Sequence, residues 1–150
     1  MKILIINGPN LNMLGRREDK FYGIESFDKI LEQLKDKFPE LEIDYFQSNV
    51  EGEIVTRIQQ LADEDYKGLL INAGAYSHYS LAIHDALLIP QIPKIEVHLS
   101  NIYLREEFRR KSVLTRACDG IIAGLGKESY RLALEYFQHN QRSRIGFNRK

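Results

Sequence analysis

The segment Glu96-Val97-His98 places a carboxylate and an imidazole two residues apart. In an extended chain, side chains two residues apart lie on the same face, so Glu96 and His98 can form a hydrogen-bonded pair. A carboxylate beside an imidazole fixes the ring tautomer and favours the protonated ring, which suits a general acid. Such a pair can also serve the fold alone, but its place at the end of an apolar run favours catalysis.

A second polar segment, residues 72–80, also follows an apolar run and contains Asn72 and His78. Its small residues permit close approach of the backbone to a ligand, and the N–H groups of a following helix favour anions. On its position alone, His78 is equally well explained as a surface or helix-capping histidine.

The longest polar segment covers residues 7–25, whereas connections in α/β proteins usually take about 2–6 residues. It contains amides, arginines and a tyrosine, among them Asn10, Arg17 and Tyr22. A connection of this length in a compact domain is typical of a functional lid. A solvated loop held in place by its glycines is the alternative.

Several other catalytic and binding motifs are absent from the sequence. It contains no GxxxxGK[ST] phosphate loop, no GxSxG nucleophile elbow and no HExxH metal site. Gly124-Leu125-Gly126 lacks the third glycine of a dinucleotide-binding fingerprint. The three polar segments therefore carry the functional hypothesis.

Short apolar runs separate these polar segments and predict strands. Four runs are rich in Ile, Val or Leu and too short for helices, which is typical of strands buried on both faces of a parallel sheet. They are residues 3–6, 69–71, 95–97 and 120–123. Residues 41–46 alternate apolar and polar side chains, which predicts a strand nearer the sheet edge.

Helical patterns fill the intervals between the predicted strands. A period of about 3.6 residues appears in residues 27–38, 80–88 and 127–139. Ser48 and Glu51 have the spacing of a capping box before a further helical pattern. Pro39 ends the first helix.

Strands and helices therefore alternate, with one extra short helical segment before the last strand. This order predicts an α/β protein with a flavodoxin-like, doubly wound, five-stranded parallel sheet in a single domain over residues 1–150. In such sheets ligands bind beyond the carboxyl ends of the strands, where the three polar segments lie. We expect a lid over about residues 11–24 and a basic tail over about residues 141–150.

Composition limits the class of protein. Lys and Arg total 21, as do Asp and Glu, so the net charge is zero, which argues against a general binder of nucleic acid or membrane surfaces. A hydrophobic share of 43% excludes wholesale disorder. Cys118 is the only cysteine, which fits a reducing compartment. The apolar run at residues 3–6 is too short for a signal peptide, so we expect a cytoplasmic protein.

Four segments resemble, in order and spacing, the motifs of the type II 3-dehydroquinate dehydratase family. They are residues 7–18 with Tyr22-Gly23, residues 72–78, residues 96–101 and residues 105–109. The resemblance implies a flavodoxin-like enzyme without metal or cofactor. It implies reversible anti elimination of water from 3-dehydroquinate to 3-dehydroshikimate through an enolate. The reaction belongs to the shikimate pathway of aromatic amino acid biosynthesis and also to quinate catabolism.

The resemblance also implies catalytic roles. Tyr22 would remove the C2 proton of the substrate, with the Arg17 guanidinium favouring its phenolate. Asn10 would hold the water that stabilises the enolate oxygen. His98, oriented by Glu96, would protonate the departing C1 hydroxyl.

Further residues of the resemblance would bind the substrate. Asn72 would position the C1 hydroxyl, and Ser100 with the backbone of Leu99 would hold the carboxylate. His78 and Arg109 would bind the ring hydroxyls. Members of the family usually form dodecamers built from trimers.

The same resemblance implies that Asp85 reaches into the active site of a neighbouring subunit. Two other functions remain open on the residues alone. One is a flavodoxin-like binding module without catalysis, which would tolerate Tyr22→Phe. The other is an RNA- or nucleotide-binding protein that uses the basic residues 105–111 and the basic tail, with strongly salt-dependent binding.

Overall fold

The computed structural model describes residues 1–16 and 25–140. Arg17, Tyr22, most of the predicted lid and the basic tail lie outside the described residues.

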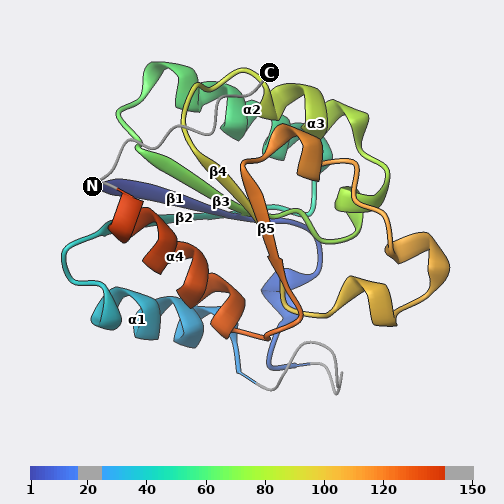
Figure 1. The fold of residues 1–150 in the computed structure, drawn as a ribbon, viewed down its shortest axis with the longest axis horizontal. Coiled ribbons are helices and arrows are strands. Elements are labelled where there is room, and N and C mark those ends of the chain that lie inside the picture. The colour runs from blue at the N-terminus through green and yellow to red at the C-terminus, as the bar shows by residue number, and fades with distance from the viewer. Residues whose placement is uncertain (17–24, 141–150) are drawn as a thin grey trace.

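Five parallel strands form one sheet (Figure 1). They are β1 (Lys2–Asn7), β2 (Glu42–Gln47), β3 (Gly68–Asn72), β4 (Lys94–His98) and β5 (Gly120–Ala123). The spatial order is β2-β1-β3-β4-β5, and every neighbouring pair is parallel. The order of the strands reverses between β1 and β3, as in flavodoxin-like sheets. The predicted five-stranded, doubly wound sheet is therefore confirmed.

Four helices cover the two faces of this sheet. α1 (Phe27–Lys37) and α4 (Glu128–Asn140) lie on one face, and α2 (Glu51–Gln60) and α3 (Leu81–Leu87) lie on the other (Figure 1). Short 3-10 turns occupy the connections, at Leu11–Met13, Leu61–Asp63, Gly74–His78, Ile102–Leu104, Glu107–Arg109 and Thr115–Ala117. Within the described ranges, no helix is both long enough and apolar enough to cross a membrane.

Local signals set most of the helix ends. The hydroxyl of Ser26 accepts a hydrogen bond from the N–H of Lys29 at the start of α1, and that of Ser80 accepts one from Ile83 at the start of α3. The first helix ends before Pro39, since a proline disfavours the helical conformation of the residue that precedes it.

The start of α2 differs from the prediction. Its N-cap is Val50, which offers no side-chain hydrogen bond. Ser48 lies two residues earlier, where its hydroxyl accepts from the N–H of Val50 at 2.9 Å and donates to Glu53. The predicted capping box of Ser48 and Glu51 is therefore wrong, because the Ser48 hydroxyl is already used in the turn before the helix.

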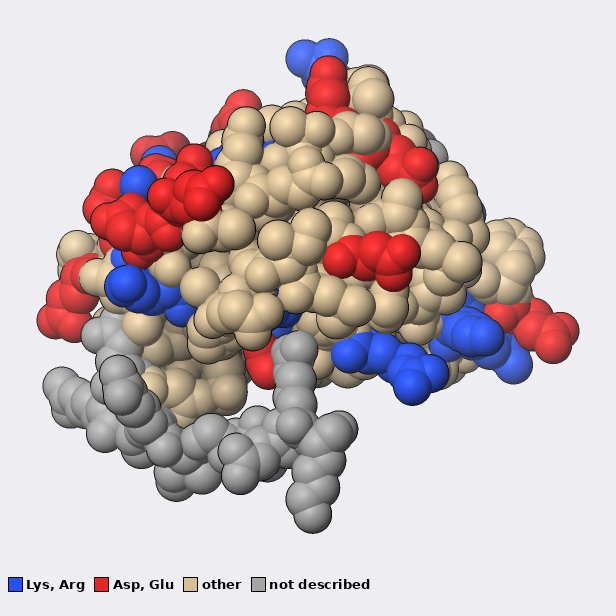
Figure 2. Space-filling view, turned by 90° about the horizontal axis from the view of Figure 1, so that it is seen from above, with Lys and Arg blue, Asp and Glu red and all other residues tan. Residues whose placement is uncertain are grey.

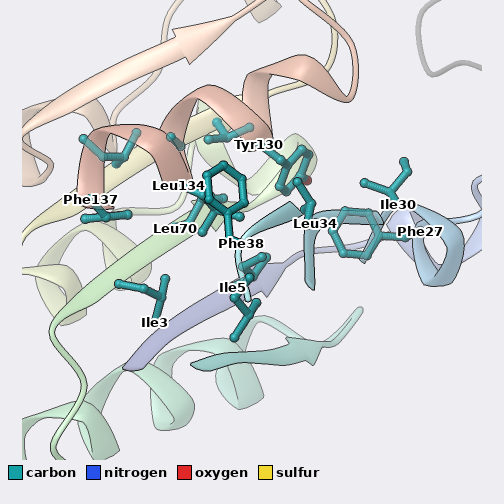
Figure 3. Close-up of a cluster of buried hydrophobic side chains, with 14 of the residues drawn as sticks. Ile3, Ile5, Phe27, Ile30, Leu34, Phe38, Leu70, Tyr130, Leu134 and Phe137 are labelled. Carbon is teal, nitrogen blue, oxygen red and sulfur yellow. The ribbon is translucent and has the colours of Figure 1, made fainter. Parts of the chain in front are cut away.

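Alternate side chains of the strands enter two separate apolar clusters. Ile3 and Ile5 of the first strand point toward α1 and α4, where they meet the rings and leucines drawn in Figure 3. Leu4 and Ile6 point the other way, toward α2 and α3. Each fully buried side chain of this size contributes about 1.5–3 kcal/mol to folding. The two clusters hold the sheet between its helices and leave its carboxyl edge to the loops.

Two loops pass each other closely where β1 and β3 end. The N–H of Gly8 donates to the carbonyl of Asn72 at 2.7 Å. A Cβ added to Gly8 would lie 2.4 Å from the Ala73 oxygen. Gly74 has a φ of +59° and lies against the backbone of Pro9. The close approach brings the first and third connections to the same edge of the sheet.

This close approach makes Gly8 sensitive to substitution. Gly8→Ala is expected to lower the free energy of unfolding by about 1–3 kcal/mol, because its Cβ overlaps the Ala73 carbonyl. Gly52 is the control, since a Cβ there would meet no atom within 4 Å and the residue lies in α2. Gly52→Ala is expected to raise the unfolding free energy by about 0.5–1 kcal/mol. Urea denaturation measures both, and equal effects would contradict the close contact.

Candidate active site

A cavity of about 140 Å³ opens at the carboxyl edge of the sheet, where the connections after β1, β3 and β4 meet. Seven of the eleven predicted site residues line it, namely Asn10, Asn72, His78, His98, Leu99, Ser100 and Arg109. These residues are far apart in the sequence, and the reversal of strand order between β1 and β3 brings their loops together.

The other predicted residues lie elsewhere. Glu96 is fully buried behind His98, and Asp85 is exposed on α3, outside the cavity lining. Arg17 and Tyr22 are outside the described residues. The structure adds Arg105, whose side chain lines the cavity and is 12% exposed. The charges of residues 104–111 have the pattern of a solvated helix face, from which one arginine could still reach an anionic ligand. In the structure this segment forms short irregular turns, and these carry Arg105 into the cavity.

Glu96 lies at the centre of a buried hydrogen-bond cluster. The Nε2 atom of His98 is 2.8 Å from Glu96 Oε1. The hydroxyls of Ser112 and Thr115 donate to Oε1 and Oε2 of the same carboxylate. Burial raises the pKa of Glu96, but the three donors outweigh it and hold the pKa of this carboxyl below its usual value. Glu96 is therefore an anion at neutral pH.

The anion determines which nitrogen of His98 carries a proton. A carboxylate only accepts hydrogen bonds, so Nε2 of His98 is the donor toward Glu96. Nδ1 remains as the ring nitrogen of this cavity-lining residue that can serve a ligand. The predicted juxtaposition of Glu96 and His98 is confirmed. When the ring is protonated, Nδ1 can donate a proton into the cavity.

His78 lies beside His98 and carries its hydrogen on the other ring nitrogen. The two rings are stacked, with centroids 6.3 Å apart. Nδ1 of His78 lies 2.8 Å from the carbonyl oxygen of Lys111, so Nδ1 is the donor. Burial lowers the pKa of His78, and the charges of Arg105 and Arg109 act in the same direction. His78 is therefore neutral at neutral pH and can accept a hydrogen bond at Nε2.

Two guanidinium groups give the cavity positive charge. Arg105 and Arg109 both line it. The Nε of Arg109 lies 2.9 Å from the Glu106 carboxylate, which restrains this side chain. Guanidinium groups at a half-enclosed site favour anionic and hydroxyl-bearing ligands. The cavity therefore suits a small polar anion.

A buried polar network holds Asn72 at the cavity. The hydroxyl of Tyr130 donates to Asn7 Oδ1 at 2.7 Å and accepts from Asn72 Nδ2 at 2.8 Å. The Oδ1 atom of Asn72 accepts from the N–H of Gly74 at 3.2 Å. Burial raises the pKa of Tyr130, and it raises the pKa of Tyr45, which accepts from Asn7, to about 12. Both tyrosines stay protonated at neutral pH and serve as structural partners.

Asn10 reaches the cavity through an uncommon backbone conformation. Its φ is +69°, in the left-handed region that asparagine tolerates better than most residues. The N–H of Asn10 donates to Asn49 Oδ1 at 3.0 Å, and the amide of Gln47 donates to the same oxygen at 3.1 Å. The last residue of β2 and the residues after it thus hold the connection after β1 in place.

Comparison with known proteins agrees with this architecture. The family model described as dehydroquinase class II matches residues 1–138. The chain is 56% identical over 135 residues to a 3-dehydroquinate dehydratase of Caldicellulosiruptor saccharolyticus, a match that covers 89% of this chain and 93% of the relative. It is 49% identical over 146 residues to a 3-dehydroquinate dehydratase of Clostridium perfringens, covering 96% of this chain and 100% of the relative.

A solved structure gives the same result at the level of the fold. The crystal structure of type II dehydroquinase from Butyrivibrio crossotus has a TM-score of 0.89 to this chain at 45% sequence identity, and the match covers 92% of this chain and 97% of that one. With the family match over residues 1–138 and these identities, the chain belongs to the dehydroquinase class II family.

Proposed function

We propose that this chain is a type II 3-dehydroquinate dehydratase, a hydro-lyase that reversibly converts 3-dehydroquinate to 3-dehydroshikimate. The observation that carries the proposal is the hydrogen-bonded pair of Glu96 and His98 at a cavity with two guanidinium groups. Anti elimination of water needs a base, a group that stabilises the enolate and an acid for the leaving hydroxyl. The described residues supply the acid and the binding groups.

The acid step uses His98. Its imidazolium donates the Nδ1 proton to the departing C1 hydroxyl, while Glu96 holds Nε2 and stabilises the positive charge. Asn72 positions this hydroxyl, since its amide lines the cavity and is held by Tyr130. The negative charge of Glu96 is retained throughout, as the low pKa of its carboxyl allows.

The binding groups surround the same cavity. Ser100 and the backbone of Leu99 hold the substrate carboxylate. Arg109 and the neutral ring of His78 bind the hydroxyls of the carbon ring, with the arginine as donor and His78 Nε2 as acceptor. Arg105 adds a second positive charge for the anionic substrate. This arrangement weakens the alternative of an RNA-binding surface, because two arginines of the basic segment line the cavity.

The base step is assigned to the lid. Tyr22 removes the C2 proton, Arg17 favours its phenolate, and Asn10 holds the water that stabilises the enolate oxygen. The two tyrosines of the buried network with Asn7 and Asn72, Tyr45 and Tyr130, are unsuited to this role, because burial raises their pKa. The connection after β1 is assigned the role of a lid that excludes water from the reaction. Its described start is fixed, since Leu11 and Leu14 are buried in the apolar cluster beneath α1 and α4.

The active form is proposed to be a homo-oligomer, a dodecamer built from trimers, in the cytoplasm. The exposed side chains of Leu81 and Asp85 on α3 lie at helical spacing with Leu88 at its C-cap, and Ile89 continues this stripe. Figure 2 views the side on which α2 and α3 lie in Figure 1, and the centre of this face carries few charged side chains. An apolar surface around an acidic residue suits a subunit contact that delivers Asp85 to a neighbour's cavity.

Turnover of 3-dehydroquinate tests the activity. The purified protein is expected to generate the conjugated enone of 3-dehydroshikimate, followed as rising ultraviolet absorbance. Tyr22→Phe and His98→Ala should each lower kcat on the order of 10²–10⁴-fold, because each removes a proton-transfer group. Tyr103→Phe and His139→Ala alter exposed residues and are the controls. Folded wild-type protein without turnover would overturn the proposal, and full activity of Tyr22→Phe would remove Tyr22 as the base.

Static light scattering tests the assembly. The wild-type protein is expected to have the mass of twelve chains. Leu81→Glu should yield smaller species, since it places a charge in the apolar stripe of α3, whereas Leu81→Met should keep the wild-type mass. Asp85→Ala should keep the mass and lower kcat/KM. A monomeric wild-type protein with full activity would contradict the role of Asp85 across subunits.

A further inference from the structure

We infer that Ser112 and Thr115 are positioning residues for the acid step, whose hydroxyls hold Glu96 as an oriented anion and thereby set how readily His98 gives up its proton. The inference rests on the proposed dehydration. Neither residue is among those that line the cavity, so neither is expected to touch the substrate.

The hydrogen bonds around Glu96 restrict the orientation of its carboxylate. Oε1 accepts from His98 Nε2 and from the Ser112 hydroxyl, and Oε2 accepts from the Thr115 hydroxyl. The side chain of Glu96 is 0% exposed. A neutral carboxyl would carry its own hydrogen on one oxygen and compete with these donors, whereas an ionised carboxylate accepts all three. The cluster therefore favours the anion.

The Ser112 hydroxyl is itself oriented. Its Oγ accepts a hydrogen bond from the N–H of Leu114 at 3.1 Å, which leaves its hydrogen to point at Glu96. Val113 donates from its N–H to the carbonyl of Ser77 at 2.8 Å, so the same stretch is tied to the connection after β3. These contacts fix the donor before any ligand binds.

Buried apolar residues anchor both hydroxyls to the fold. Leu114 and Ala117 are 0% exposed and belong to the apolar cluster beneath α2 and α3. The turn Thr115–Ala117 packs against α3. Ser112 and Thr115 thus come from a segment held by the core, and no other described hydroxyl donates to Glu96 in the structure.

The two hydroxyls and the ring of His98 all donate hydrogen bonds to the Glu96 carboxylate, so each donor weakens the hold of the carboxylate on the others. Without the Thr115 hydroxyl, Oε2 would be buried without this donor, and the carboxylate would hold the protonated ring more tightly. His98 would then be a poorer proton donor. The other charged or titratable groups that face the pair are the stacked His78 and the cavity arginines Arg105 and Arg109, and none of them is altered by a change at Thr115.

Paired variants separate positioning from a structural role. Thr115→Val keeps the shape of the side chain and removes its hydroxyl, whereas Thr115→Ser keeps the hydroxyl. With 3-dehydroquinate, Thr115→Val is expected to lower kcat roughly 10–100-fold, as loss of an orienting outer partner does at metal sites. KM should stay within about 2-fold, because uniform substrate binding is unchanged. The alkaline limb of the kcat–pH profile should move to higher pH.

The remaining variants test the same step. Thr115→Ser should restore most of kcat and the wild-type pH profile, and Ser112→Ala should lower kcat in the direction of Thr115→Val. Thr56→Val, at an exposed position of α2, is the control for loss of a threonine hydroxyl. Wild-type kcat and pH profile in folded Thr115→Val and Ser112→Ala would overturn the inference, as would a Thr115→Ser enzyme as slow as Thr115→Val. If Thr115→Val does not fold, the kcat and pH profiles of Ser112→Ala and Thr115→Ser test the inference instead.

A substrate-free measurement separates this inference from the proposed function. If wild-type protein fails to dehydrate 3-dehydroquinate, the proposed function is overturned, and ¹⁵N NMR of the His98 ring still reports on the cluster. The pH midpoint of the His98 ring signals is expected to move upward in Thr115→Val and to return in Thr115→Ser. Identical titrations in the three proteins would overturn the role of the hydroxyl.

Discussion

Burial of the Glu96 carboxylate is the constraint on which the active-site edge depends. An ion withdrawn from water costs several kcal/mol unless donors replace the water. The imidazole of His98 and the hydroxyls of Ser112 and Thr115 are those donors. To supply them, the connection after β4 must fold back over the strand that carries Glu96. That connection contains the short turns Ile102–Leu104 and Glu107–Arg109 before it brings Ser112 and Thr115 to Glu96 and returns to β5.

The sheet determines where this cluster meets the rest of the site. The order β2-β1-β3-β4-β5 places the ends of β1, β3 and β4 side by side, so that Asn10, Asn72 and His98 line one cavity. Apolar clusters on both faces hold the strands in this arrangement. Tyr130 links α4 to Asn72 through a buried hydrogen bond. Glu96 with His98, and Asn72, are thus supported from opposite faces of the sheet.

The regular parts of the fold could be predicted from the sequence. Strand and helix positions follow from periods of 2 and 3.6, and the same period of 2 brings Glu96 and His98 together. The contacts of residues in irregular segments could not be predicted in the same way. Ser112, Thr115 and Arg105 lie in a segment of short turns without periodicity, so nothing in their spacing indicated which atoms they would reach. Ser48 had the spacing of a capping residue, but its hydroxyl is used one turn earlier.

The resemblance to a known family supplied residue roles that spacing alone could not, including those of Arg17 and Tyr22, which the described residues do not include. The fold and its relatives establish the family, and the chemistry of the described residues supports the acid half of the reaction.

The ionisation state of Glu96 is the most direct test of this account. In protein carrying ¹³C at the glutamate side-chain carboxyls, the Glu96 resonance can be identified by its loss in Glu96→Gln. It is expected to have the chemical shift of a carboxylate at neutral pH and to titrate at a lower pH than an ordinary glutamate, since the three donors lower its pKa. A Glu96 resonance that shows a protonated carboxyl at neutral pH would contradict the account.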